Sequence, residues 1–207
     1  MRHRATPLVV VMAAVLSGTT AVGDDAKEGF DAEGYVCTWL VLAPIPLNEG
    51  QNGADALEKD GVAGEANLKP EAGDKVDVGG KNLTWKECHA KEQILDFNEL
   101  LGKKTENSVG YAVAYIVADA DVDDVTLKVG SDDQIKVYLN GKAIHSHDEG
   151  RPLEKDEDNI AGLSLRKGRN VLVVKVVNEE DDWAMSARFV DKDGKPVTGL
   201  KATTKRG

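Results

Sequence analysis

The stretch Lys128-Val-Gly-Ser-Asp-Asp-Gln-Ile-Lys-Val-Tyr-Leu-Asn-Gly-Lys142 decides which fold this sequence predicts. Apolar residues alternate with polar residues on both sides of its acidic centre: Val125, Leu127 and Val129 before it, and Ile135, Val137 and Leu139 after it. A two-residue period places each apolar set on one face of a β-strand. The stretch therefore predicts two strands, each with a buried face.

Turn signals follow each of these two strands. Gly130-Ser-Asp-Asp133 combines a residue that tolerates positive φ with side chains that bond nearby backbone N–H groups. We expect it to form a tight acidic turn that reverses the chain. Asn140-Gly141 is the preferred pair for a type I′ turn, so residues 142–145 are expected to form the second strand of a hairpin. We expect this hairpin to form the middle of the fold.

Other stretches of β-branched and aromatic residues recur between turn signals: 35–42, which Ala43-Pro-Ile-Pro46 ends, 83–88, 110–118, 160–165, 170–178, 183–190 and 197–200. Such short strands, with almost no helical periodicity, predict an all-β fold, an antiparallel β-sandwich or barrel. The strands at 110–118 and 170–178 are mostly apolar, so both are expected to be central. Residues 94–101 suit a helical turn as well as a strand.

Residues 48–80 differ from the rest, because Gly, Asn, Asp, Glu and Ala dominate and large apolar residues are few. We expect a long loop insertion after the first strand, with a short turn of helix near residues 54–59. A loop of this length is either functional or mobile, and its low apolar content favours a mobile surface segment.

Composition and the chain ends suggest an exported protein of one domain. The 207 residues are 41% hydrophobic with a formal net charge of −10, which suits one core and argues against nucleic acid as a partner. A basic start, an apolar run at 7–16 and small residues at 21–23 predict a signal peptide over residues 1–23.

The remaining divisions follow from this leader. They are an N-terminal extension at 24–34, a sandwich domain at 35–200 and a basic C-terminal tail at 201–207. We expect no membrane span in the mature chain, and a secreted, periplasmic or cell-envelope location. In an oxidising compartment Cys37 and Cys88 are candidates for a disulfide; the alternative is two buried thiols in neighbouring strands.

Several of these motifs occur together in one known group of proteins: Gly130-Ser-Asp-Asp133, Val137-Tyr-Leu-Asn-Gly-Lys142, Leu165-Arg-Lys-Gly168, Asn170-Val-Leu-Val-Val-Lys175, Trp39, Ala43-Pro-Ile-Pro46, Trp85, and Asp96-Phe97. In these motifs the chain resembles exported bacterial modules of the galactose-binding-like, jelly-roll superfamily. The resemblance implies a jelly-roll β-sandwich. It also implies an association with carbohydrate-active or cell-envelope proteins, and some members of the superfamily bind sugars.

The candidate ligand-binding residues are Asp132, Asp133, Arg151 and Trp85. The two aspartates can accept hydrogen bonds from a sugar or bind Ca²⁺; alternatively they cap their own turn and pair with the loop around Arg151. That arginine is expected to hold Asp156 or Asp158 of the same loop. Thr84, Lys86 and Glu87 flank Trp85, so it is the tryptophan that a ligand is expected to reach. Trp39 and Trp183 are expected in the core.

Asp119, Asp121 and Asp123 crowd one connection and are the weaker candidates for a structural Ca²⁺. The EF-hand pattern fails there, and a solvated acidic turn is the alternative. His145 and His147, two residues apart, suit either an exposed hairpin or two ligands of a transition metal. We expect no other cofactor.

No hydrolase elbow, zinc-protease, phosphate-loop or dinucleotide motif occurs in the sequence. The sequence therefore predicts a secreted non-catalytic binding module, with carbohydrate as the first choice of ligand. The alternative is a structural or interaction domain of the envelope, without a sugar site, that docks to another exported protein. A sugar module should have a polar pocket with an exposed ring, and an interaction module should have a larger apolar patch.

Overall fold

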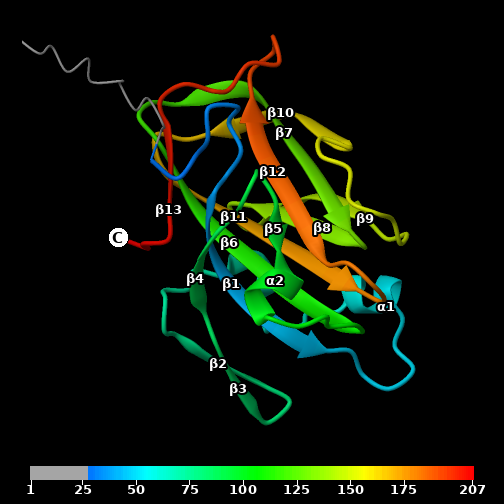
Figure 1. Ribbon diagram of the computed structural model, residues 1–207. Coiled ribbons are helices and arrows are strands. Elements are labelled where there is room, and N and C mark those ends of the chain that lie inside the picture. Colours follow the sequence, from blue (N-terminus) through cyan, green and yellow to red (C-terminus); the bar gives the residue numbers. More distant parts are fainter. Residues whose placement is uncertain (1–27) are drawn as a thin grey trace, which may run out of the picture.

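Residues 28–207 are described by a computed structural model, and two antiparallel sheets form the sandwich (Figure 1). The predicted signal peptide and residues 24–27 lie outside the described residues. The larger sheet has the order β4 (Lys86–His89), β1 (Thr38–Pro46), β6 (Ser108–Ala118), β11 (Gly168–Asn178), β8 (Ile135–Leu139), β9 (Lys142–His147), with β13 (Leu200–Thr203) also paired to β6. The smaller sheet has the order β10 (Asp158–Leu165), β7 (Val122–Asp132), β12 (Ala184–Val190), β5 (Leu95–Asp96). The predicted all-β sandwich is confirmed.

The remaining elements are short: α1 (Gly53–Glu58), the 3-10 helix η1 (Glu65–Asn67), the hairpin β2 (Lys75–Val78) and β3 (Lys81–Thr84), and α2 (Phe97–Leu101). Residues 94–101, which suited a strand or a helix, contain both. Asp96 ends β5 and caps α2 by accepting the Glu99 N–H at 2.8 Å, and Gly102 ends the helix with φ +67°. Among residues 28–207 no helix is long and apolar enough to cross a bilayer.

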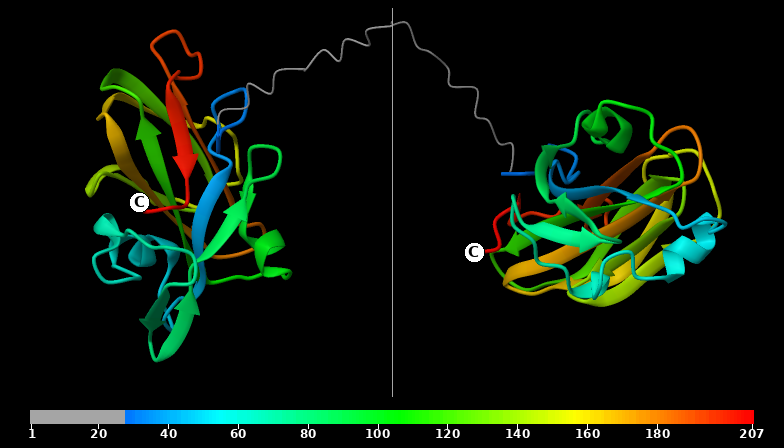
Figure 2. Two further views of the ribbon diagram at one scale, coloured as in Figure 1. Left: turned by 90° about the vertical axis from the view of Figure 1, so that its left-hand side faces the viewer. Right: turned by 90° about the horizontal axis from the view of Figure 1, so that it is seen from below.

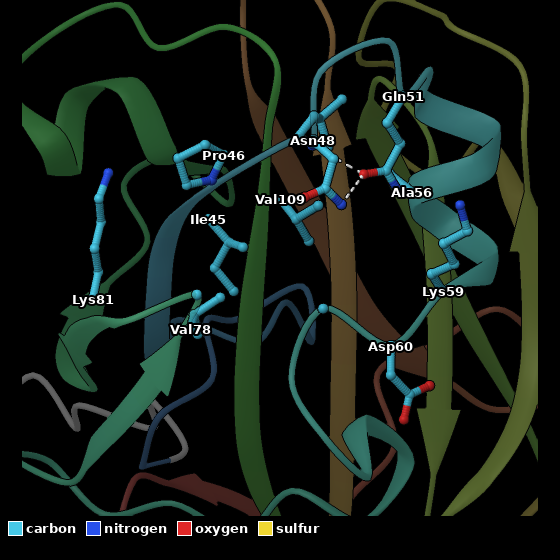
Figure 3. Close-up of a pocket in the computed structure, with 13 residues that line it drawn as sticks. Ile45, Pro46, Asn48, Gln51, Ala56, Lys59, Asp60, Val78, Lys81 and Val109 are labelled. Atoms are coloured by element: carbon cyan, nitrogen blue, oxygen red, sulfur yellow. Dashed lines mark hydrogen bonds between the residues drawn. The ribbon is translucent and has the colours of Figure 1, made fainter.

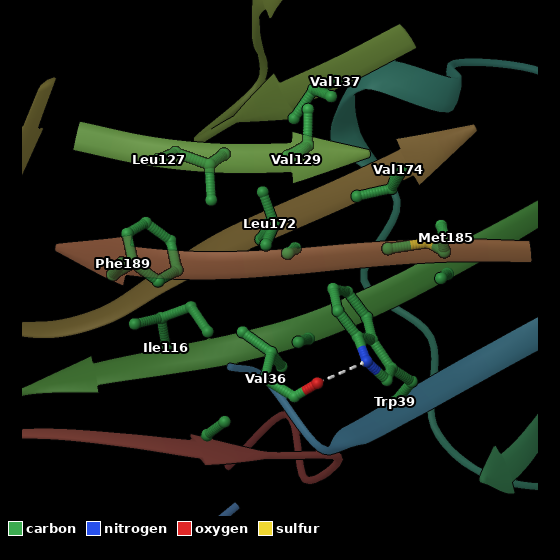
Figure 4. Close-up of a cluster of buried hydrophobic side chains, with 14 of the residues drawn as sticks. Val36, Trp39, Ile116, Leu127, Val129, Val137, Leu172, Val174, Met185 and Phe189 are labelled. Carbon is green, nitrogen blue, oxygen red and sulfur yellow. Dashed lines mark hydrogen bonds between the residues drawn. The ribbon is translucent and has the colours of Figure 1, made fainter. Parts of the chain in front are cut away.

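The main core lies between the two sheets (Figure 4). Leu172 and Val174 of the larger sheet and Leu127 and Phe189 of the smaller one belong to it, and all are buried. Both tryptophans predicted in the core are there, and both indole rings are buried. Trp39 donates its indole N–H to the Val36 carbonyl at 3.0 Å, and Trp183 stacks on Phe97 at 4.6 Å between ring centroids.

The acidic turn is not a hairpin turn, and that prediction was wrong. Gly130, Ser131 and Asp132 are the last residues of β7, which pairs with β10 and β12, whereas β8 pairs with β11 and β9. The chain therefore crosses from one sheet to the other at Asp133 and Gln134. The Asp133 N–H donates to the Val177 carbonyl of β11 at 3.1 Å, which fixes the crossing. Gly130 is needed near the end of β7 because a Cβ would lie 1.9 Å from the Glu154 carbonyl oxygen. The prediction failed because apolar and polar residues alternate in the same way along a strand that ends in a hairpin turn and along one that crosses to the other sheet.

The hairpin at Asn140 exists, but it lies at one edge of the larger sheet rather than in the middle. Asn140 and Gly141 have φ values of +52° and +82°, as a type I′ turn requires. The centre is formed by β6 and β11, which pair along their whole length. These are the strands that sequence predicted to be central, because both of their faces are apolar.

Residues 48–80 are the largest departure from expectation. This segment, named the excursion below, packs on the outer face of the larger sheet instead of forming a mobile surface loop (Figure 2). Its few large apolar side chains pack against the sheet, where Leu57 and Val62 form a second buried cluster with Tyr111 and Val173. The predicted helical turn is confirmed as α1. A segment poor in apolar residues is ordered here because the sheet supplies the rest of the cluster.

A buried ion pair fastens the excursion to the sheet. The Lys175 ammonium of β11 lies 3.0 Å from the Glu65 carboxylate, and it also donates to the carbonyls of Leu57 and Lys59 at the end of α1. The hydroxyls of Tyr111 and Tyr138 both donate to Glu65. Burial lowers the pKa of Lys175 and Glu65 opposes it, while burial and Glu65 raise the pKa of Tyr111.

Both ends of the predicted domain need correction. In the expected N-terminal extension, Phe30 is buried and bridges to Val36. The expected tail begins inside a strand, because β13 pairs with β6 and buries Ala202 while Lys201 faces solvent. The alternation of Leu200, Lys201 and Ala202 was concealed by the basic residues around it.

The strand boundaries also differ in two places. The expected strand at 83–88 is divided at Trp85 into β3 and β4, which belong to different sheets. The first strand does not end at Ala43 but continues to Pro46, with an irregular register between Leu42 and Ile45. Prolines are tolerated where the ladder is already interrupted in this way.

Replacing Lys175 with Met should destabilise the fold by about 3–5 kcal/mol, because it leaves the Glu65 carboxylate buried and unpaired. Urea unfolding would measure this. The control is Lys91→Met, which removes the exposed pair with Glu99 and should change the free energy of unfolding little, because water and salt screen that pair. The double variant Lys175→Met/Glu65→Gln should recover part of the loss, since no charge then remains buried. Equal costs for the two single lysine variants would contradict this role of the pair.

Candidate functional site

Three of the four predicted ligand residues lie together in the structure. Asp132 ends β7, Asp133 lies at the crossing that follows, and Arg151 lies in the connection between β9 and β10; together they line one open depression of about 380 Å³. The rest of its lining is Pro152 and the acidic run Glu180, Asp181 and Asp182. The acidic stretch at 130–133 and the loop around Arg151, which were grouped from the sequence, thus do lie together, although the connection between β7 and β8 was misjudged.

Arg151 is already engaged by the protein. Its guanidinium forms a two-pronged contact with Asp158, with N···O distances of 3.2 and 2.5 Å, and donates to the Ser131 hydroxyl at 3.1 Å. Burial alone would raise the pKa of Asp158, but Arg151 and His145 bring it below its ordinary value. The expected clamp on the loop is therefore present. Asp156 belongs to a different contact, with Arg188.

The two aspartates have different roles. Asp133 accepts the Glu179 N–H at 2.9 Å through its carboxylate, so it caps the crossing on which it lies. Burial, followed by the charge of Asp133, raises the pKa of Asp132 to about 6. Since the neighbouring residues 180–182 are also acidic, the depression has more negative charge than its single arginine can balance.

Trp85 does not reach this depression, and the expectation that it is exposed was wrong. Its side chain is 2% exposed and belongs to the cluster under the excursion. Its polar neighbours misled the prediction, because Lys86 and Glu87 are exposed while the ring of Trp85, between β3 and β4, packs inward. The other aromatic side chains are also buried: Phe30, Tyr35, Trp39, Phe97, Tyr111, Tyr115, Tyr138, Trp183 and Phe189. In the described residues, then, a sugar has no exposed ring to stack on.

Two of the weaker metal candidates, Asp121 and Asp123, contact residues at or beside the turn between β10 and β11, whereas Asp119 lies beside Gly199. Asp121 accepts the Lys167 N–H at 2.6 Å, Asp123 accepts the Ser164 hydroxyl at 2.5 Å, and the Asp119 N–H donates to the Gly199 carbonyl at 3.0 Å. Within residues 28–207 no three or more His, Cys, Asp or Glu side chains are arranged to hold a metal ion. His145 instead pairs with Asp158 at 3.0 Å.

Cys37 and Cys88 are free thiols in the structure, each half-buried. Cys88 of β4 lies opposite Trp39 of β1, and the Ala90 N–H donates to the Cys37 carbonyl. Cys37, directly before β1, is therefore a diagonal neighbour of Cys88. Burial raises the pKa of both thiols, which keeps them protonated at neutral pH.

A second concavity, which we name the excursion cleft, lies between the excursion and the end of β1 (Figure 3). It has a volume of about 390 Å³, and its lining combines aliphatic and polar groups. Ile45 and Val109 come from the sheet, Ala56 from α1 and Val78 from β2. The polar groups around them are Asn48, Gln51, Lys59, Asp60 and Lys81.

Some of the polar groups in the excursion cleft are satisfied and others are free. Asn48 donates its backbone N–H and its side-chain amide to the Gln51 Oε1 atom at 3.1 and 2.9 Å, which leaves the Gln51 NH₂ group and the side-chain Oδ1 atom of Asn48 unused (Figure 3). One oxygen of Asp60 accepts the Gly64 N–H at 3.1 Å. Lys59 and Lys81 are exposed and have no carboxylate partner among the described residues.

Sequence reasoning missed this cleft, and no local signal would have revealed it. Its lining comes from four separate parts of the chain, 45–48, 51–61, 78–81 and Val109. These parts meet only because the excursion folds back over β6.

The comparisons with known proteins do not identify this chain. No protein-family model and no curated protein matches it. Among solved structures it is similar to the PA14 domain of the MpAFP antifreeze protein, with TM-score 0.34, 12% identity, and coverage of 50% of this chain and 58% of that one. It is also similar to the GH31 alpha-xylosidase Xac1773 from Xanthomonas citri, with TM-score 0.30 and 13% identity, over 78% of this chain and 18% of that one. At these TM-scores neither similarity carries an argument about function.

The pH dependence of stability should reveal the environment of Asp132. Its pKa is about 6 in the folded protein against 3.8 ordinarily, so the folded state binds this proton more tightly than the unfolded state. The group therefore costs stability above pH 6, and the cost disappears as pH falls toward the ordinary value. Asp132→Asn should raise the free energy of unfolding at about pH 7.5 and change it little at about pH 3.5.

Asp181 lines the same acidic depression as Asp132, and Asp181→Asn should have the opposite effect on stability near neutral pH. The hydrogen bond from Lys104 lowers the pKa of Asp181, so this substitution should lower stability near neutral pH, by a small amount because the carboxylate is exposed. Urea unfolding of both variants at the two pH values would measure the difference. A gain from Asp132→Asn that persists at the lower pH would contradict the assignment.

Proposed function

We propose that this chain is an exported, non-catalytic binding module whose ligand is a carbohydrate held in the excursion cleft. The observation that carries the proposal is the mixed lining of that cleft. A sugar ring has a C–H surface and hydroxyl groups at its edge, so it needs an apolar floor beside groups that donate and accept hydrogen bonds. Ile45, Val78 and Val109 supply such a floor, and Asn48 and Gln51 supply the polar edge.

The size of the cleft supports a small ligand. About 390 Å³ lies at the lower end of the range for small-molecule sites and suits one or two sugar rings. Because the described residues offer no exposed aromatic ring, binding depends on hydrogen bonds and aliphatic contact. Affinity should then be modest, with Kd between about 0.1 and 10 mM.

The acidic depression is the weaker candidate. Arg151 and Asp133 already hold the β9–β10 connection and the crossing, and the remaining groups there are nearly all carboxylates. A ligand there would have to displace internal bonds or approach a concentrated negative charge, both of which cost binding energy.

The rival function is an interaction domain that docks through an apolar surface. Among the described large hydrophobic residues only Leu100 is exposed, at 38%. A single exposed side chain does not make an apolar interface. A docking partner could still use a sheet edge such as β9 or β10, but the polar cleft favours the small-ligand function.

Export and the absence of catalysis complete the proposal. The basic start, apolar run and small residues of 1–23 support a signal peptide. The lack of a catalytic motif in the sequence supports a binding role.

Amide NMR titration of the folded chain with a panel of monosaccharides and disaccharides would test the site. A binding sugar should shift the amide signals of residues 45–61 and 78–81. Gln51→Ala should weaken binding about three- to tenfold, because it removes one hydrogen-bonding group from the cleft. Glu180→Gln, on the rim of the acidic depression, is the matched control and should leave affinity unchanged. Shifts confined to the acidic depression would place the sugar elsewhere, and no shifts with any saccharide would contradict the proposed function.

A further inference from the structure

We propose that the excursion cleft selects acidic saccharides, those with a carboxylate on the ring such as uronic acids, over their neutral counterparts. This inference rests on the proposed function and specifies its ligand class. The cleft places two unpaired ammonium groups, Lys59 and Lys81, on opposite sides of a site in a chain whose formal net charge is −10 (Figure 3).

The free state of these two lysines is the first observation. The sheet lysines beneath the excursion have carboxylate partners, since Lys136 pairs with Glu58 and Lys175 pairs with Glu65, whereas the exposed lysines of the excursion have none in the described part of the chain. Lys59 and Lys81 differ from the other unpaired lysines, Lys69 and Lys75, in lining the cleft. Their charges are therefore available to a bound anion.

The balance of donors and acceptors points the same way. The free groups of the cleft include two ammonium groups and the NH₂ group of Gln51, all of which only donate. The free side-chain acceptors are the Asn48 Oδ1 atom and the second oxygen of Asp60. Donors outnumber acceptors, and a carboxylate is the sugar substituent that accepts hydrogen bonds without donating any.

Asp60 orients the ligand rather than opposing it. Figure 3 shows its carboxylate apart from the Asn48–Gln51 pair and from Lys81. One of its oxygens is occupied by the Gly64 N–H, and the other can accept a sugar hydroxyl. We therefore place the hydroxyl edge of the sugar toward Asp60 and its carboxylate toward Lys81 across the cleft, with the Lys59 charge adding to the attraction from the opposite side.

The backbone that carries the two lysines is held in place. The Lys59 carbonyl accepts from the buried Lys175 ammonium, so the end of α1 is fixed while the Lys59 side chain remains free. Lys81 follows the Gly79-Gly80 turn, where φ values of +58° and +79° require glycine-like freedom. Two fixed attachment points with mobile charged ends suit an exposed anion site of modest strength.

The test compares sugars that differ only in charge. Methyl α-D-galacturonoside and methyl α-D-galactoside differ at C6, and the methyl ester of the acid is an uncharged analogue of similar shape. Amide NMR titration of the folded chain at about 20 mM salt should give about tenfold tighter binding for the acid than for either neutral glycoside. At about 500 mM salt this preference should shrink, because both lysines are exposed to solvent.

Charge-removing variants assign the preference to the cleft. Lys59→Gln and Lys81→Gln should each weaken binding of the acid about threefold and leave binding of the neutral glycoside unchanged. The double variant should bind acid and neutral sugar equally. Lys75→Gln, an exposed lysine of β2 that does not line the cleft, is the matched control and should behave as the wild type.

Each other outcome overturns the inference in a distinguishable way. Equal binding of acid and neutral glycosides by the wild type would overturn the selectivity and leave the proposed function standing. A preference for acid that survives in the double variant would move the anion contact out of the cleft. Sodium sulfate and sodium chloride can be compared at one ionic strength. If sulfate displaces the acid sugar from the cleft where chloride does not, the lysines attract any multivalent anion, and the selectivity for an acidic saccharide is overturned. No binding of any of the three glycosides to about 50 mM would overturn the inference, and only the further absence of shifts with every sugar of the saccharide panel would overturn the proposed function as well.

Discussion

The contact between Lys175 and Glu65 is the interaction on which the outer half of this molecule depends. It joins the central strand β11 to the excursion, and it lies where water does not reach. Such a pair adds little net stability when complete, but either charge alone would be very costly to bury. The pair therefore favours the one position of the excursion on the sheet in which both charges are paired, and it disfavours other positions. Because Lys175 also bonds the carbonyls at the end of α1, the same contact sets one wall of the excursion cleft.

The two central strands explain why the excursion is needed. One face of β6 and β11 packs into the core between the sheets, and the other carries Tyr111, Val113 and Val173 outward. A strand that is apolar on both faces needs cover on both. The sandwich covers one face, and residues 48–80 cover the other. The sequence contained this requirement, since both faces of 110–118 were recognised as apolar, yet the segment that meets it was judged by its own low apolar content.

Local signals were predicted well and long-range placement was not. The hairpin at Asn140 was correct because two positive φ values are a local demand that Asn-Gly meets. The crossing at Asp133 and Gln134 was mistaken for a reversal because alternation does not tell which sheet a strand joins. Asp132, Asp133 and Arg151 could be grouped from one acidic stretch and one nearby loop, but Trp85 was misplaced because its charged neighbours are exposed while its own ring is buried. The excursion cleft, assembled from four separate parts of the chain, had no local signal at all.

The distribution of the three tryptophans has a spectroscopic consequence. Trp39 and Trp183 lie between the sheets, whereas Trp85 lies in the cluster beneath the excursion. All three indoles are shielded from water, so the intact protein should emit at short wavelength. If the excursion detaches while the sandwich persists, one indole of the three becomes hydrated and the emission moves part of the way to the red. Intrinsic fluorescence can thereby distinguish opening of the outer layer from global unfolding without any label.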